Sequence, residues 1–156
     1  MASLVGFICL LTAVFTNLFL IFSNFFLKIK YLRYDQLVRI ASVLTIFSFL
    51  SLMYAYIISD FSNFNVFENS HSKKPLIYKI SGTWGNHEGS MLLWISILSI
   101  YALFFSYTKN IDLEFKKLIL IIQSSLHILF GLFIILTSNP FLINSVVVKE
   151  GLGLNP

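Results

Sequence analysis

The chain has 156 residues, of which 57% are hydrophobic and 12% charged, and its formal net charge is +4. Soluble domains usually carry about 25% charged residues, so a composition this apolar excludes an ordinary water-soluble domain. Because the basic residues flank apolar segments, membrane topology explains the positive charge better than a nucleic-acid partner does.

Four uncharged stretches, each about 20 residues or longer, predict transmembrane helices. None of them contains a proline, and they cover residues 4–27, 40–59, 89–108 and 118–138. In lipid, each backbone N–H must be hydrogen-bonded within its own segment, which favours helices, and the alternation at period two that is typical of a membrane barrel is absent. The predicted fold class is an all-α integral membrane protein with four transmembrane helices.

The first stretch is predicted to stay in the mature protein. A cleaved signal peptide has basic residues before a shorter apolar core, whereas no Lys or Arg precedes this one. Its Cys9 is the only cysteine of the chain, so an internal disulfide, a Cys-x-x-Cys redox pair and a thiolate metal cluster are excluded. We expect Cys9 to be a packing or lipid-facing residue.

Orientation follows from the basic residues of the loops. The first and third loops hold seven of them, namely Lys28, Lys30, Arg33, Arg39, Lys109, Lys116 and Lys117. The longer second loop, residues 60–88, holds three, namely Lys73, Lys74 and Lys79. The positive-inside rule places the first and third loops in the cytoplasm or a mitochondrial matrix, so both termini and the second loop are expected outside.

The second loop ends in a stretch rich in glycine. Gly82, Gly85 and Gly89 predict turns or close backbone approaches just before the third span. Trp84 lies near the expected membrane boundary, where tryptophan is typical of an interfacial anchor.

Two interpretations of Trp84, His87, Glu88 and Gly89 are open. In the first, they form the capped start of the third span, with Glu88 near the positive end of the helix dipole. In the second, they form a surface that contacts a cofactor or a partner protein. A lone histidine without a second ligand at metal spacing does not predict a metal site, and no metal site is expected.

Two other histidines differ in their surroundings. His71 lies between serines in the second loop and is expected to be solvated. His127 lies near the middle of the fourth span, on one helix face with Gln123 and Gly131. An ionisable residue at that depth is a functional candidate, for example as an axial haem ligand. The alternative is a neutral histidine hydrogen-bonded to another helix, with Gly131 allowing close packing.

A highly specific string runs from Trp84 to Trp94 and reads Trp-Gly-Asn-His-Glu-Gly-Ser-Met-Leu-Leu-Trp. With this string the chain resembles the haem lyase family CcmF/NrfE of cytochrome c biogenesis. The resemblance keeps its order and spacing over essentially the whole chain, through residues 55–56, 59–62, 68–70, 75–94, 137–141 and 153–156.

The resemblance implies a function. Members of this family take haem from a haem chaperone at the outer face of the inner membrane. They join its vinyl groups to the two thiols of a Cys-x-x-Cys-His motif in an apocytochrome c, which thiol-reducing and delivery subunits supply. Haem is therefore the implied cofactor. A bacterial cytoplasmic membrane is favoured as the location, and the mitochondrial inner membrane is the alternative.

The resemblance also sets limits. Family members are several times longer, and their Trp-rich haem-binding segment and haem-ligating histidines lie after the point that corresponds to Pro156. We therefore expect residues 1–156 to be a truncated form or one piece of a split haem lyase, inactive alone, and we assign no catalytic residue. The alternative class is a small stand-alone membrane protein, such as an assembly subunit or a transporter, although broken helices and intramembrane charges are absent.

Overall fold

The computed structural model describes residues 1–27, 33–145 and 148–153. Its four long helices are α1 (Ala2–Phe22), α2 (Tyr34–Ile57), α5 (His87–Ser106) and α6 (Leu113–Thr137). The π-helical turn η1 (Ser23–Leu27) follows α1, and the short helices α3 (Phe64–Asn69) and α4 (Leu76–Gly82) lie between α2 and α5. Four helices are long and apolar enough to cross a membrane, which confirms the predicted all-α class with four spans.

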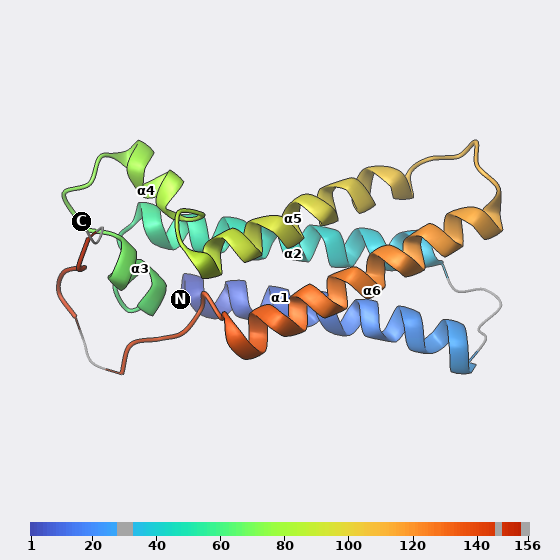
Figure 1. The fold of residues 1–156 in the computed structure, drawn as a ribbon, viewed down its shortest axis with the longest axis horizontal. Helices are drawn as coiled ribbons and strands as arrows, with labels where there is room; N and C mark the ends of the chain where they lie inside the picture. Colours follow the sequence, from blue (N-terminus) through green and yellow to red (C-terminus); the bar gives the residue numbers. More distant parts are fainter. Residues whose placement is uncertain (28–32, 146–147, 154–156) are drawn as a thin grey trace.

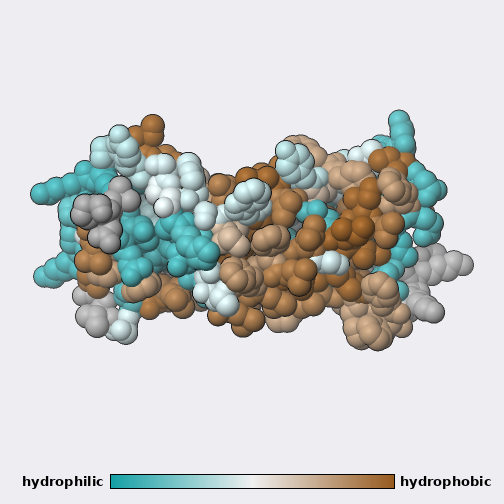
Figure 2. Space-filling view, viewed as in Figure 1, coloured by the Kyte–Doolittle hydropathy of each residue, from teal (hydrophilic) through white to brown (hydrophobic). Residues whose placement is uncertain are grey.

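The long helices form an elongated bundle in which α1 packs chiefly against α2, α2 also packs against α5, and α6 packs against α1 and α5. The N-terminus, α3, α4 and the chain after α6 all lie at one end, here called the loop end (Figure 1). The α5–α6 connection and the start of α2 lie at the other, basic end. Hydrophilic side chains gather at both ends, and hydrophobic ones cover the middle (Figure 2). This distribution is the one that a membrane-spanning bundle requires.

Helices α2 and α6 begin several residues before the uncharged stretches that predicted them. The added residues include charged side chains, and these side chains find partners. Helix α6 includes Lys116, whose ammonium donates to the Asp35 carboxylate at 2.9 Å. The same ammonium donates to the carbonyl oxygens of Ser106 and Thr108 at 2.8 Å. The first carbonyl belongs to the last residue of α5 and the second lies just after it, where backbone acceptors lack intrahelical donors. Hydropathy alone excluded Lys116 from the span.

Helix α2 contains Arg39 for a similar reason. Its guanidinium donates to the Ser106 hydroxyl at 2.9 Å and to the Ser106 carbonyl at 3.0 Å. It also lies 3.8 Å from the centre of the Tyr107 ring, a cation–π contact. One basic residue from α2 and one from α6 therefore complete the end of α5 and fix the basic end of the bundle.

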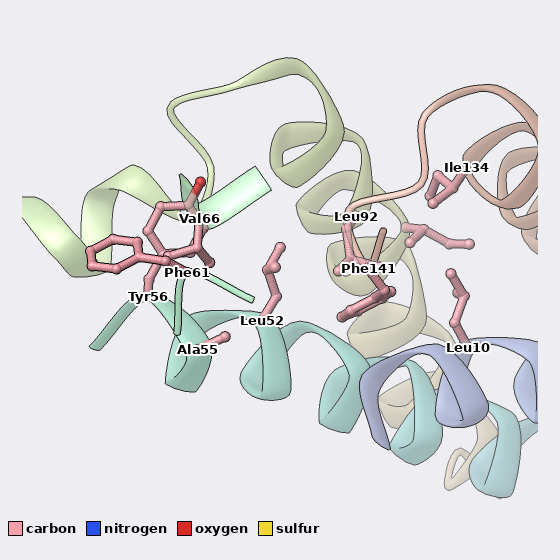
Figure 3. Close-up of a cluster of buried hydrophobic side chains, with 10 residues drawn as sticks. Leu10, Leu52, Ala55, Tyr56, Phe61, Val66, Leu92, Ile134 and Phe141 are labelled. Carbon is pink, nitrogen blue, oxygen red and sulfur yellow. The ribbon is translucent and has the colours of Figure 1, made fainter. Parts of the chain in front are cut away.

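The larger apolar core lies at the loop end (Figure 3). It joins side chains from α1, α2, α5 and α6 with others from the loop and the tail, namely Leu10, Leu52, Ala55, Tyr56, Phe61, Val66, Leu92, Ile95, Ile134 and Phe141. A Cβ atom on Gly6 would come within 2.3 Å of the Phe141 ring, so the tail closes directly onto α1. Likewise a Cβ on Gly131 would come within 2.4 Å of Val14, which supports the predicted close helix packing there.

Candidate functional site

The candidate site is built on a contact between the second loop and the chain that follows α6. The Phe64 amide donates to the Leu142 carbonyl at 2.8 Å, and the Leu152 amide donates to the Phe67 carbonyl at 2.8 Å. These bonds give the non-helical tail the backbone partners that it cannot supply itself. The second loop and the tail therefore form one cap over the loop end, which the sequence analysis did not predict.

Asn63 ties this cap to the bundle. Its side chain accepts from the Val66 amide at 2.9 Å and so caps α3. Its Nδ2 donates to the Ser3 hydroxyl at 3.0 Å and to the Pro140 carbonyl at 2.9 Å. One fully buried amide thus links the start of α1, the loop and the tail.

A carboxylate also fastens the tail. The Glu150 side chain accepts from the Ser72 hydroxyl at 2.7 Å and from the Ser72 amide at 2.8 Å. These two hydrogen bonds lower the pKa of the Glu150 carboxyl to about 2, so it stays ionised at any physiological pH. His71 Nδ1 lies 3.8 Å from the same carboxylate, with 35% of the His71 side chain exposed. His71 is therefore partly exposed and lies beside the tail.

The start of α5 is held by a network of four polar side chains. Asn86 Oδ1 accepts from the Gly89 amide at 2.8 Å, which makes Asn86 the N-cap of α5. Asn86 Nδ2 donates to the Tyr56 hydroxyl at 2.9 Å, which in turn donates to Asn65 Oδ1 at 2.6 Å. Asn65 Nδ2 donates to Asn86 Oδ1 at 2.9 Å and to a Glu88 carboxylate oxygen at 3.1 Å. The network closes on itself and joins α2, α3 and α5.

Of this network, Glu88 is among the site residues predicted from the sequence, whereas Asn86, Asn65 and Tyr56 are not. An asparagine directly before an apolar helical run is a recognised start signal, so Asn86 could have been found from the sequence. Nothing local pairs Tyr56 with Asn65, because they meet only when the loop folds back over α2. Glu88 is bonded to Asn65 rather than free at the surface.

The sequence offers four residues as a possible contact surface, namely Trp84, His87, Glu88 and Gly89. They lie together at the loop end, but their surroundings differ. His87 Nε2 lies 3.1 Å from the Ser138 hydroxyl, so it joins the start of α5 to the end of α6. Gly89 is buried against the Thr83 carbonyl. Trp84 exposes 40% of its surface. His87 is exposed as well, so Trp84 and His87 are the two of the four that are best placed to meet another molecule.

The intramembrane candidates contact two different helices. His127 Nε2 lies 2.7 Å from the Thr45 hydroxyl, which donates its own proton to the Ala41 carbonyl at 2.9 Å. Because the single proton of the Thr45 hydroxyl is used in that bond, His127 Nε2 is the donor to Thr45. Gln123 donates to the Leu98 carbonyl at 2.9 Å. Both are interhelical hydrogen bonds of the kind that the packing interpretation predicts.

Three cavities lined by described residues offer no haem ligand. None of the three has a histidine in its wall, and the roomiest of them, about 380 Å³, is an open apolar groove of Met91, Leu129, Phe130 and Phe133. Nor do the residues described here include a group of three or more His, Cys, Asp and Glu side chains that could hold a metal ion. We therefore derive no ligand or reaction step for haem from this chain.

Comparison with known proteins links the chain to cytochrome c biogenesis. It is 50% identical over 110 residues to the cytochrome c-type biogenesis protein CycK of Bradyrhizobium diazoefficiens, an alignment that spans 70% of the chain and 17% of CycK. It is 37% identical over 113 residues to the cytochrome c-type biogenesis protein CcmF of Escherichia coli, with 70% of the chain and 17% of CcmF aligned. No family model matches.

A solved structure has the same fold. The structure of the cytochrome c haem lyase CcmF superposes with a TM-score of 0.78 and 24% identity, covering 90% of this chain and 25% of that one. The chain thus spans about a sixth of the length of the curated relatives, since its alignments cover 17% of them. Over the part that it spans, the chain belongs to the CcmF/NrfE family of cytochrome c-type biogenesis proteins.

Proposed function

We propose that the chain is a component of a haem lyase that attaches haem to apocytochromes c at the outer face of an inner membrane. Such an enzyme adds each cysteine thiol of a Cys-x-x-Cys-His motif across a haem vinyl group to give a thioether. The observation that carries the proposal is the 50% identity to CycK over 110 residues. The partners follow from the same proposal: a haem chaperone, the apocytochrome and its thiol-reducing and delivery subunits.

Within this enzyme, the chain supplies a shaped surface rather than a haem ligand. The loop end is stiffened by the Asn63 and Asn86 hydrogen bonds, and it carries the exposed Trp84. Rigid elements hold binding groups more accurately than free loops do. We infer that the cap docks against the haem chaperone or the downstream part of the lyase.

Coexpression tests this function. Residues 1–156 alone will leave a Cys-x-x-Cys-His cytochrome without covalent haem, because the haem-ligating histidines that the resemblance implies lie after the point that corresponds to Pro156. Coexpressed with the downstream part of a family member, in cells that lack their own haem lyase, the same chain will restore haem-stained cytochrome c. The downstream part expressed alone is the control. Covalent haem formed by residues 1–156 alone, or no restoration by the pair, would refute the proposal.

We further propose that both termini and the second loop face the outer side. Ser3 and the tail meet the loop at one end of the bundle, while Arg33, Arg39 and Lys116 lie at the other. The positive-inside rule puts the basic end inside.

Reporters on the two ends test this orientation. A reporter that is active only in the cytoplasm should work when fused after Thr108 and fail near Ser70. A reporter that is active only outside the cytoplasm should give the opposite result. The reversed pattern in both assays would contradict the assignment.

A further inference from the structure

A polar cavity lies at the basic end, at the opposite end of the bundle from the proposed site, and shares no residue with it. Its volume is about 220 Å³, and it opens between the first turns of α2 and α6. Its walls combine charged, aromatic and aliphatic side chains, namely Arg33, Tyr34, Asp35, Leu113, Lys116, Lys117 and Leu120.

The charges of this cavity do not cancel. Lys116 is already engaged, because it bonds to Asp35 at 2.9 Å and to two backbone carbonyls. The one carboxylate in the wall is therefore neutralised by Lys116. Arg33 and Lys117 remain as two positive charges that line the same space, and the Lys117 ammonium lies 5.0 Å from the centre of the Tyr34 ring.

Such a cavity suits a phosphate group. A guanidinium and an ammonium are the side chains that bind phosphate oxygens in proteins, the first through paired N–H donors and the second as a point charge. The cavity therefore favours an anion, and both unneutralised cations can contact the oxygens of one phosphodiester.

The position of the cavity separates a lipid from a free anion. Leu113 forms part of its wall with 74% of its surface exposed, and the hydrophobic middle of the bundle adjoins this end (Figure 2). A soluble phosphate would leave Leu113 facing water, whereas the acyl chains of a lipid would cover it. We propose that this cavity binds the phosphate of an anionic phospholipid headgroup at the basic end of the bundle.

Lipid titration of the purified chain in neutral detergent tests the site. Phosphatidylglycerol is titrated against phosphatidylcholine, and the bound lipid is counted by native mass spectrometry. We expect phosphatidylglycerol to bind preferentially, and Lys117→Gln to weaken it about fivefold, which corresponds to about 1 kcal/mol per basic residue near a membrane surface. Arg33→Gln combined with Lys117→Gln should weaken it by about the product of two such factors, and Lys117→Arg should bind normally.

Lys109→Gln is the matched control, because Lys109 is an exposed lysine of the same end that does not line the cavity. It removes the same charge and should change binding less than about twofold. If Lys109→Gln and Lys117→Gln weaken phosphatidylglycerol binding equally, the lipid is attracted by the general surface charge. That result would overturn the proposed site. Equal competition by inorganic phosphate or glycerol phosphate would show a soluble-anion site and overturn the lipid assignment. Circular dichroism of each variant checks that the helices are intact.

Discussion

Replacing Gly89 by alanine will remove most of the folded chain from the membrane. A Cβ atom at this position would lie 1.7 Å from the carbonyl oxygen of Thr83 and 2.9 Å from its carbonyl carbon. Both are backbone atoms, so no side-chain rotation can relieve the clash. Thr83 is itself fully buried, which leaves its peptide little room to retreat. The turn before α5 would have to move away from the helix.

That movement would break the network around Asn86. Its side chain spans the turn and the helix, bonding to Gly89 on one side and to the Gly82 carbonyl at 2.9 Å on the other. Forcing a methyl group into a filled site costs about 1–3 kcal/mol, and loss of an N-cap costs about 1 kcal/mol more. Against a total stability of about 5–15 kcal/mol, such a loss is large. Membrane abundance by blotting and the melting temperature in detergent measure it.

Gly85→Ala is the matched control for this prediction. Gly85 lies in the same turn, but its added Cβ would meet its nearest neighbour, the Ser81 carbonyl oxygen, at an ordinary 3.4 Å. Abundance of this variant should stay close to normal. Equal losses of abundance in Gly85→Ala and Gly89→Ala would show that the close approach to Thr83 is not the reason why position 89 requires glycine.

Hydropathy found the spans because the membrane imposes one simple rule on the sequence, a long uncharged helix. Helices α2 and α6 begin before the predicted spans, because that rule treats every charge as a boundary. Lys116 is only 8% exposed, yet it is tolerated because Asp35 and two carbonyl groups neutralise and solvate it. Pairing of this kind between separate helices leaves no trace in a hydropathy profile.

Part of the candidate site could likewise be predicted from the sequence, and part of it could not. The glycine-rich string before α5 stands out in the sequence, and Gly89 does make the close approach that its glycine predicts. The fold of the tail over the second loop could not be predicted, because the Asn63–Pro140 bond joins residues 77 apart and neither has a local pattern that implies the other. Tyr56 was missed for a related reason, since its hydroxyl lies at the end of an otherwise ordinary apolar helix.

Trp84→Ala should leave the protein abundant and its function poor. With 40% of its surface exposed, Trp84 contributes less to packing than a buried residue would, so truncation should cost little stability. Exposed tryptophan at a docking surface often dominates binding energy, and a loss of about 2 kcal/mol or more corresponds to more than about tenfold weaker docking. In cells that carry the chain with the downstream part of the lyase, cytochrome c maturation per molecule should fall by a similar factor. Tyr78→Ala, which removes another exposed aromatic residue of the second loop, should mature cytochrome c normally.

Variants at His87 distinguish a structural role from a functional one more sharply than the Trp84 variant does. The imidazole lies 3.1 Å from the Ser138 hydroxyl, and a residue that only joins α5 to α6 would act through this contact. Ser138→Ala deletes the contact and keeps the imidazole, whereas His87→Ala deletes both. We expect His87→Ala to reduce cytochrome c maturation strongly at nearly normal abundance, and Ser138→Ala to reduce it little. We do not expect His87 to ligate iron, so the haem absorption spectrum of the purified lyase should change little. Equal effects of the two variants, or a yield that falls only in proportion to protein level, would show that His87 serves the packing of the loop end and does not meet a partner.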